Sequence, residues 1–198
     1  HEWRFHPGAV FVRQIVSGAG AAPQDSAGLY LTSSVLEGGE PNIGYDKVIP
    51  PDATEGVAVA MFKGHCLKLW GDTIGVCQFA MDRIAGTLDL AVKSIEATVG
   101  WTPFTQEEAM LVGERVSTLQ RLVSLHRGYD PESDFDISER MLIVPEGPAQ
   151  GKAIPLGPHL RKWREEFYQA VNWDADTGWP RPEALERMGL AGFKVGKS

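Results

Sequence analysis

The sequence is poor in cysteine and contains no long hydrophobic run, and each shortage excludes a class of protein. Its 198 residues include two cysteines, which cannot form a disulfide framework, although a single bridge stays open. No apolar stretch approaches the roughly 20 residues of a transmembrane helix. We therefore expect a protein of a reducing, cytoplasmic compartment with no membrane partner.

Basic residues are also few relative to acidic ones. Lysine and arginine number 19 against 26 aspartate and glutamate, and the net charge is −7. A nucleic-acid-binding surface needs a basic face, so no nucleic-acid partner is expected. Residues 1–4 show no basic-then-apolar pattern, so we expect no signal peptide. The length and the 43% hydrophobic content suit a globular protein with a sizeable core.

Strand-like alternation is not convincing anywhere, whereas helical spacing recurs. Residues 57–70 are apolar nearly all round, which predicts a buried helix. Asp52 is its expected N-cap, with Glu55 at the capping-box position. Residues 87–98 predict a second helix, capped by Thr87.

The clearest helical pattern begins at Thr105, which has Glu108 at the capping-box position, and ends at Gly128. Residues 159–173 predict another helix. Pro182 suits the first position of a short helix that ends at Gly189. The expected fold is therefore all-α and multihelical, with long Gly/Pro-rich loops.

We expect a single helical domain over residues 1–198. Residues 1–52 form a loop-rich segment within it, because Gly, Pro, Ser and Asp are frequent from residue 21 onward. Residues 53–190 form the helical core. A loop of this length inside a compact domain is usually functional, or an insertion that covers a surface.

The stretch with the most chemistry is Asp72-Thr-Ile-Gly-Val-Cys77, which follows the apolar segment as a turn. Gly75 permits a positive φ or close backbone approach, and backbone N–H groups around such a glycine can hold an anion. Cys77 is a soft metal ligand once deprotonated. From these residues alone, the ordinary interpretation is a helix-ending turn with a buried cysteine, with Asp72 as a capping residue.

This motif resembles the Asp-x-x-Gly-Leu-Cys motif of the aldehyde:ferredoxin oxidoreductase family, the tungsten or molybdenum bis-pterin enzymes, with Val76 in place of leucine. Further matches follow in the same order. They are Trp101 to Glu108, Gly113-Glu-Arg115, Leu119 to Leu122 with Arg127-Gly128, Ser138 to Arg140, and Phe167 to Pro180 with Ala184 to Leu190. Together they span about residues 60–190, and their order makes the resemblance specific. Residues 1–52 match poorly.

The resemblance implies that this chain is the C-terminal part of a larger enzyme. Asp72, Gly75 and Val76 would contact one pterin, and Cys77 would be the last ligand of a 4Fe–4S cluster. Because such a cluster needs four thiolates, upstream domains of the same enzyme would supply three further cysteines. Cys66 is interpreted as a core residue.

The resemblance also implies a histidine near the metal that donates or accepts a proton. His1, in His1-Glu-Trp-Arg4, is the candidate catalytic residue, and His6 is the fallback. The separation from Cys77 is longer than in the family, which would make the Gly/Pro-rich stretch an insertion. The alternative is that His1 is an arbitrary boundary residue.

The implied reaction is oxidation of an aldehyde to a carboxylic acid at a tungsten (or molybdenum) bis-pterin. Electrons would pass through the 4Fe–4S cluster to ferredoxin or another electron-transfer subunit, and a homo-oligomer is compatible with this. The rival hypotheses are the active-site subunit of a class II benzoyl-CoA reductase and a non-catalytic helical scaffold. Structural roles are expected for Glu114, Arg115, the remaining histidines (His65, His126, His159) and three tryptophans (Trp163, Trp173, Trp179).

Overall fold

The protein is an assembly of helices in the part of the chain that the computed structural model describes, which is residues 41–45, 55–81, 84–132 and 156–193. The elements are η1 (Pro41–Ile43), α3 (Val57–Ile74), α4 (Gln78–Met81), α5 (Thr87–Val99), α6 (Gln106–His126), α7 (Leu156–Ala170) and α8 (Pro182–Arg187). Within these ranges no strand forms, and an isolated β-bridge joins Trp173 to Pro180. The all-α prediction is confirmed. The prediction of one domain over residues 1–198 stays a prediction.

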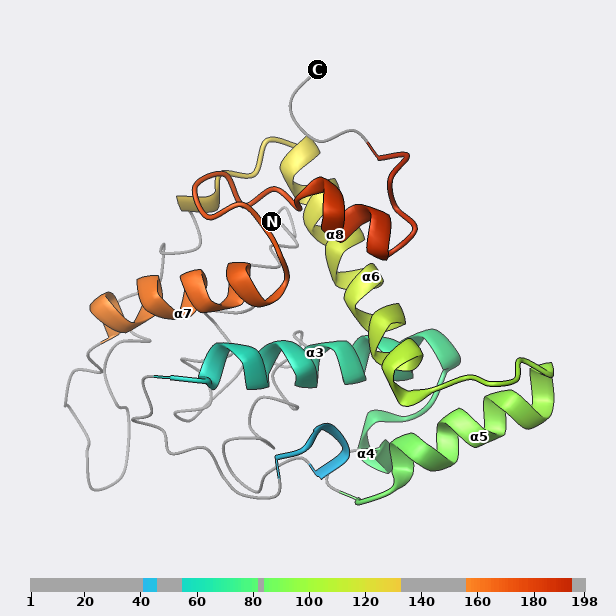
Figure 1. Ribbon diagram of the computed structural model, residues 1–198. Coiled ribbons are helices and arrows are strands. Elements are labelled where there is room, and N and C mark those ends of the chain that lie inside the picture. Colours follow the sequence, from blue (N-terminus) through green and yellow to red (C-terminus); the bar gives the residue numbers. More distant parts are fainter. Residues whose placement is uncertain (1–40, 46–54, 82–83, 133–155, 194–198) are drawn as a thin grey trace, which may run out of the picture.

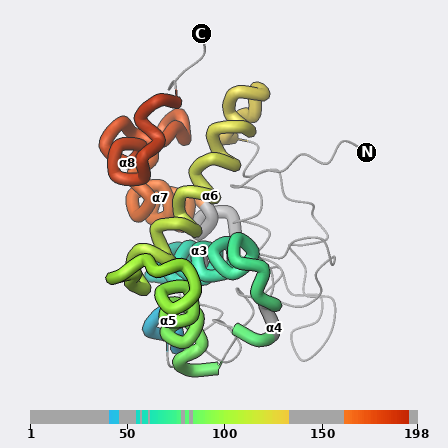
Figure 2. The backbone as a smooth tube through the Cα atoms, turned by 90° about the vertical axis from the view of Figure 1, so that its right-hand side faces the viewer, coloured from blue at the N-terminus to red at the C-terminus, as the bar shows by residue number. Residues whose placement is uncertain are grey.

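Helix α3 lies in the middle of the arrangement and the other long helices pack around it. Its largest contact is with α6, which crosses it, and α7 lies alongside its N-terminal part (Figure 1). Helix α8 lies beside the C-terminal half of α6, while α4 and α5 lie near the opposite end of the molecule, as the turned view also shows (Figure 2). None of the described helices is long and apolar enough to cross a membrane.

The two ends of α3 differ from the prediction. The helix begins at Val57 after Gly56, which has φ 74° and gives no side-chain cap, so the capping box of Asp52 and Glu55 is wrong. Asp52 itself lies outside the described residues. At the other end the helix continues past Trp70 to Ile74, and it ends at Gly75, which has φ 72°.

The other helix boundaries follow local chemistry more closely. Thr105 caps α6 and forms the predicted capping box with Glu108, and Pro182 is the first residue of α8. Thr87 is the first residue of α5 rather than its cap, and its hydroxyl donates to the carbonyls of Met81 and Ile84 at 2.8 and 2.9 Å. Gly86 takes the cap position.

A tight helix crossing holds α3 against α6. Both Cys66 on α3 and Gly113 on α6 are buried. A Cβ atom added to Gly113 would lie 2.0 Å from the Cys66 carbonyl oxygen. Glycine is therefore required there, because any side chain would force the two backbones apart.

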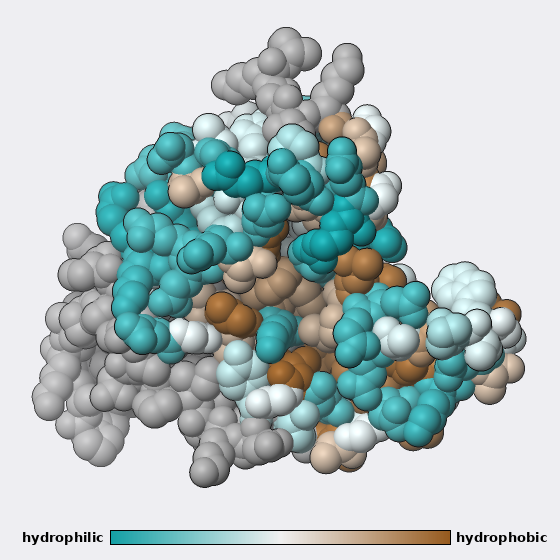
Figure 3. Space-filling view, viewed as in Figure 1, coloured by the Kyte–Doolittle hydropathy of each residue, from teal (hydrophilic) through white to brown (hydrophobic). Residues whose placement is uncertain are grey.

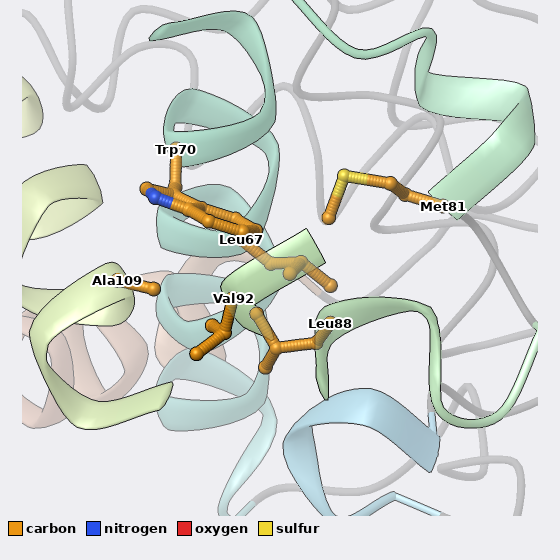
Figure 4. Packing of buried hydrophobic residues seen from close by; sticks show 6 residues of the cluster. All are labelled: Leu67, Trp70, Met81, Leu88, Val92 and Ala109. Atoms are coloured by element: carbon orange, nitrogen blue, oxygen red, sulfur yellow. The ribbon is translucent and has the colours of Figure 1, made fainter. Parts of the chain in front are cut away.

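One apolar cluster fills the space between α3, α4, α5 and the start of α6. Its buried members are Leu67, Trp70, Met81, Leu88, Val92 and Ala109 (Figure 4). The side chain of Asn42 joins η1 to this region, since it donates to the carbonyls of Met81 and Ile84 and accepts from the Leu88 amide. This cluster fixes the position of the α3 C-terminus relative to α4.

A second packing centre joins α6, α7 and the C-terminal turn around Arg121, which is fully buried. Its guanidinium donates to the Gly178 carbonyl at 3.1 Å and to the Tyr168 hydroxyl at 2.6 Å. The aromatic rings of Tyr129, Tyr168 and Trp173 lie 5.2–5.4 Å from the guanidinium carbon. Cation–π contacts of this kind stabilise a desolvated arginine.

Candidate functional site

The residues predicted to contact a cofactor, Asp72, Gly75, Val76 and Cys77, lie on the last turn of α3 and the turn that follows it. Asp72 belongs to the helix and not to a loop after it. Gly75 has φ 72° and ends the helix, with its amide bonded to the Asp72 carbonyl and the Val76 amide bonded to the Gly71 carbonyl. This pair of bonds is the left-handed glycine termination common at helix C-termini. Sequence and structure therefore agree on a sharp turn at Gly75.

The surface of this turn is open. A Cβ atom added to Gly75 would meet no atom of the described residues within 4 Å, so these residues leave room for a ligand to approach the backbone there. Val76 is partly buried and packs on the core cluster. Cys77 is exposed and not in a disulfide, so the alternative of a buried, inert thiol at this position is wrong. An exposed thiol beside an open backbone turn can take part in a ligand or metal site.

Asp72 is held by Lys68, one helical turn earlier. The Lys68 ammonium pairs with Asp72 Oδ2, and the side chain of Lys68 is only 10% exposed while that of Asp72 is 49% exposed. The pairing of Lys68 with Asp72 was not predicted from the sequence. The i,i+4 spacing of the two residues indicates such a pair only if the predicted helix is extended past Trp70.

His65 lies one turn before Lys68 on α3. Its Nδ1 atom is buried and has no hydrogen-bond partner among the described residues. Burial and the nearby Lys68 charge lower the pKa of His65 to about 4, against a smaller opposing effect of Asp72. The imidazole is therefore neutral near pH 7. The sequence-based interpretation of His65 as an ordinary histidine did not anticipate its buried Nδ1 atom.

The second cysteine has a different environment. Cys66 is buried, and burial together with the Glu114 carboxylate raises the pKa of its thiol well above the ordinary value. Such a thiol stays protonated and is a poor metal ligand. The interpretation of Cys66 as a core residue agrees with this environment.

Residues assigned structural roles are found in such roles. Glu114 pairs with Arg187 of α8 at 2.9 Å, and Arg115 donates to the Met188 carbonyl at 2.6 Å, so each finds its partner on the C-terminal segment. Trp163 and Trp173 are buried, and Trp179 stacks edge-on against His126 at 5.1 Å. His1, His6 and the side chain of His159 lie outside what the structure describes.

No group of three or more His, Cys, Asp or Glu side chains that could hold a metal ion occurs among the described residues. With two cysteines in the whole sequence, and one of them in the core, this chain offers a single accessible thiol. A 4Fe–4S cluster needs four, so Cys77 fits such a cluster only as one ligand of a shared set. The turn at Gly75 and the exposed Asp72 carboxylate likewise suit a pterin that is also held by other domains.

The described helices place a carboxylate, a glycine turn and an exposed thiol at the C-terminal end of α3. The family model described as "Aldehyde ferredoxin oxidoreductase, domains 2 & 3" matches residues 17–190, and the chain belongs to this family. The match starts earlier than the motifs alone indicated and includes most of the Gly/Pro-rich segment.

Curated relatives agree with this assignment. The chain is similar to the tungsten-containing aldehyde ferredoxin oxidoreductases of Pyrococcus furiosus and Thermococcus kodakarensis, at 28% identity over 180 residues in each case. The enzyme of the same name from Pyrococcus abyssi is 27% identical over 180 residues. These alignments cover 89% of this chain but 28% of each relative, so the chain spans less than a third of their length.

Proposed function

We propose that this chain is the C-terminal, cofactor-contacting part of an enzyme that oxidises aldehydes to carboxylic acids. Its relatives are named as tungsten-containing enzymes of this kind and are much longer than the chain. The observation that carries the proposal is the C-terminal end of α3 with the turn that follows, where Asp72, Gly75 and Cys77 match the family's motif on an accessible surface.

Each of the site residues would make a different contact with the cofactors. Asp72 would accept hydrogen bonds from N–H groups on a pterin edge, since a carboxylate is a strong acceptor. The open Gly75–Val76 backbone would allow the pterin to approach closely. Cys77 would ligate one iron of a 4Fe–4S cluster, with three thiolates supplied by upstream domains. A tungsten (or molybdenum) bis-pterin, when bound, supplies the two-electron chemistry.

Proton handling and electron transfer extend beyond the described residues. His1, with His6 as the fallback, stays the candidate for donating or accepting a proton near the substrate. Electrons would leave one at a time through the cluster to ferredoxin or a similar carrier. We also propose a cytoplasmic location and do not assign an oligomeric state.

The test is a metal analysis and an assay on the native polypeptide that carries this chain, purified without oxygen. We expect tungsten, or molybdenum in its place, and reduction of a viologen dye when aldehydes are added. Metal without aldehyde oxidation would contradict this reaction and favour the benzoyl-CoA reductase hypothesis. Absence of any such metal would favour a non-catalytic helical scaffold.

A further inference from the structure

Helix α3, which ends at the proposed pterin site, carries a lysine, Lys68, whose side chain is largely buried. Lys68 has nine-tenths of its side chain buried, and its ammonium bonds to one acceptor, Asp72 Oδ2. An ammonium carries three donors, so two are not used within the described part of the chain. A buried charge normally has its donors satisfied, because burial without partners is unfavourable.

A second Lys–Asp pair in the same protein shows what an ordinary surface pair looks like. Lys93 bonds to Asp89 at 2.6 Å on α5, again four residues apart, but its side chain is 66% exposed. Water can reach the remaining donors of a lysine that is this exposed. The Lys68 side chain is only 10% exposed, so the two pairs differ in burial while their chemistry is the same.

Asp72 complements this arrangement. Lys68 occupies Oδ2, and Oδ1 has no hydrogen-bond partner among the described residues. The Asp72 side chain is 49% exposed in the last turn of α3, while the Lys68 side chain that pairs with it is 10% exposed. The pair therefore offers an acceptor next to spare donors, on the face of α3 that ends at Gly75.

We propose that Lys68 is a further cofactor-positioning residue: it fixes the Asp72 carboxylate and, with it, recognises the adjacent N–H and C=O groups of a pterin ring. Asp72 Oδ1 would accept a hydrogen bond from a ring N–H, and the Lys68 donors not used by Asp72 would be available to a ring carbonyl. This inference rests on the proposed function and deepens it. It gives the chain a donor as well as an acceptor for the ring edge.

His65 adds a second buried polar group on α3, one turn before Lys68. Its Nδ1 atom lacks a hydrogen-bond partner among the described residues. The neutral imidazole adds no second positive charge beside Lys68. Lys68 thus remains the cation that this face of α3 presents to Asp72.

The experiment compares cofactor retention in three variants of the native, cofactor-loaded polypeptide. K68M removes the donors, K68R keeps the charge and donors, and K93M removes the matched surface lysine. Tungsten and released pterin are measured per polypeptide over time after gel filtration. Loss of an outer-shell partner commonly weakens binding about 10- to 100-fold. We expect K68M to release tungsten about tenfold faster than wild type, K68R to be closer to wild type, and K93M to be unchanged.

A structural role for Lys68 gives a different result. Melting temperatures of the cofactor-free proteins separate the two, because we expect K68M to melt no lower than K93M. Equal release by K68M and wild type would overturn the inference and leave the proposed function intact. A lower melting temperature of cofactor-free K68M with no rescue by K68R would also overturn it. Wild-type protein without tungsten or pterin would overturn both.

Discussion

Replacing Gly113 with alanine destabilises the protein by at least about 3 kcal/mol, because the new methyl group collides with backbone atoms. The added Cβ atom would lie 2.0 Å from the Cys66 carbonyl oxygen, 2.6 Å from its carbon and 2.7 Å from the Cys66 Cα atom. Backbone cannot move aside as a flexible side chain does, so α3 and α6 must separate. The urea midpoint measures the loss, provided that the slope is unchanged.

Gly71→Ala is the matched control for this substitution. Gly71 is also buried within a helix, but a Cβ atom there would meet the Met81 sulfur at 3.1 Å. That sulfur is near the end of a flexible side chain, and alanine favours the helix by about 1 kcal/mol over glycine. We expect Gly71→Ala to stay within about 1 kcal/mol of wild type. Equal stability of the two variants would contradict the close crossing at Cys66.

The second large effect is expected at Arg121. Arg121→Met leaves the Tyr168 hydroxyl and the Gly178 carbonyl without their buried donor and removes the cation from its aromatic surroundings. An unsatisfied buried polar group costs about 1–3 kcal/mol, so we expect a loss of about 3 kcal/mol in the free energy of unfolding. Urea denaturation and tryptophan fluorescence follow the loss, since Trp173 lies in this packing centre.

Arg181→Met provides the comparison in the same C-terminal turn. Arg181 is half exposed and pairs with Asp174 at 3.2 Å. Exposed ion pairs contribute about 0–1 kcal/mol, so this variant is expected to be nearly as stable as wild type. If Arg121→Met were as mild as Arg181→Met, the buried guanidinium would not organise the C-terminal turn.

Local chemistry made parts of the fold predictable from sequence. The capping box at Thr105 and the proline at the start of α8 depend on residues within one turn of each other. The start of α3 was not predictable in this way, because Gly56 takes the cap position in a left-handed conformation and gives no side-chain cap.

In the candidate site, too, the residues set by a local motif were predictable and those set by tertiary burial were not. Asp72, Gly75, Val76 and Cys77 are adjacent in sequence, so a motif could place them on one turn. Lys68 was missed because its importance comes from burial, which a single sequence does not display. The Arg121 contacts join residues 47 and 57 positions apart, so no local pattern predicts them.

The exposed thiol of Cys77 and the buried thiol of Cys66 are expected to have opposite roles, and comparing them tests the candidate site most directly. Iron and acid-labile sulfide are measured in native protein purified without oxygen, in Cys77→Ser and in Cys66→Ser. We expect about four irons per polypeptide in wild type and in Cys66→Ser, and loss of most iron in Cys77→Ser. Four irons retained in Cys77→Ser, or none in wild type, would contradict the assignment of Cys77 as a cluster ligand.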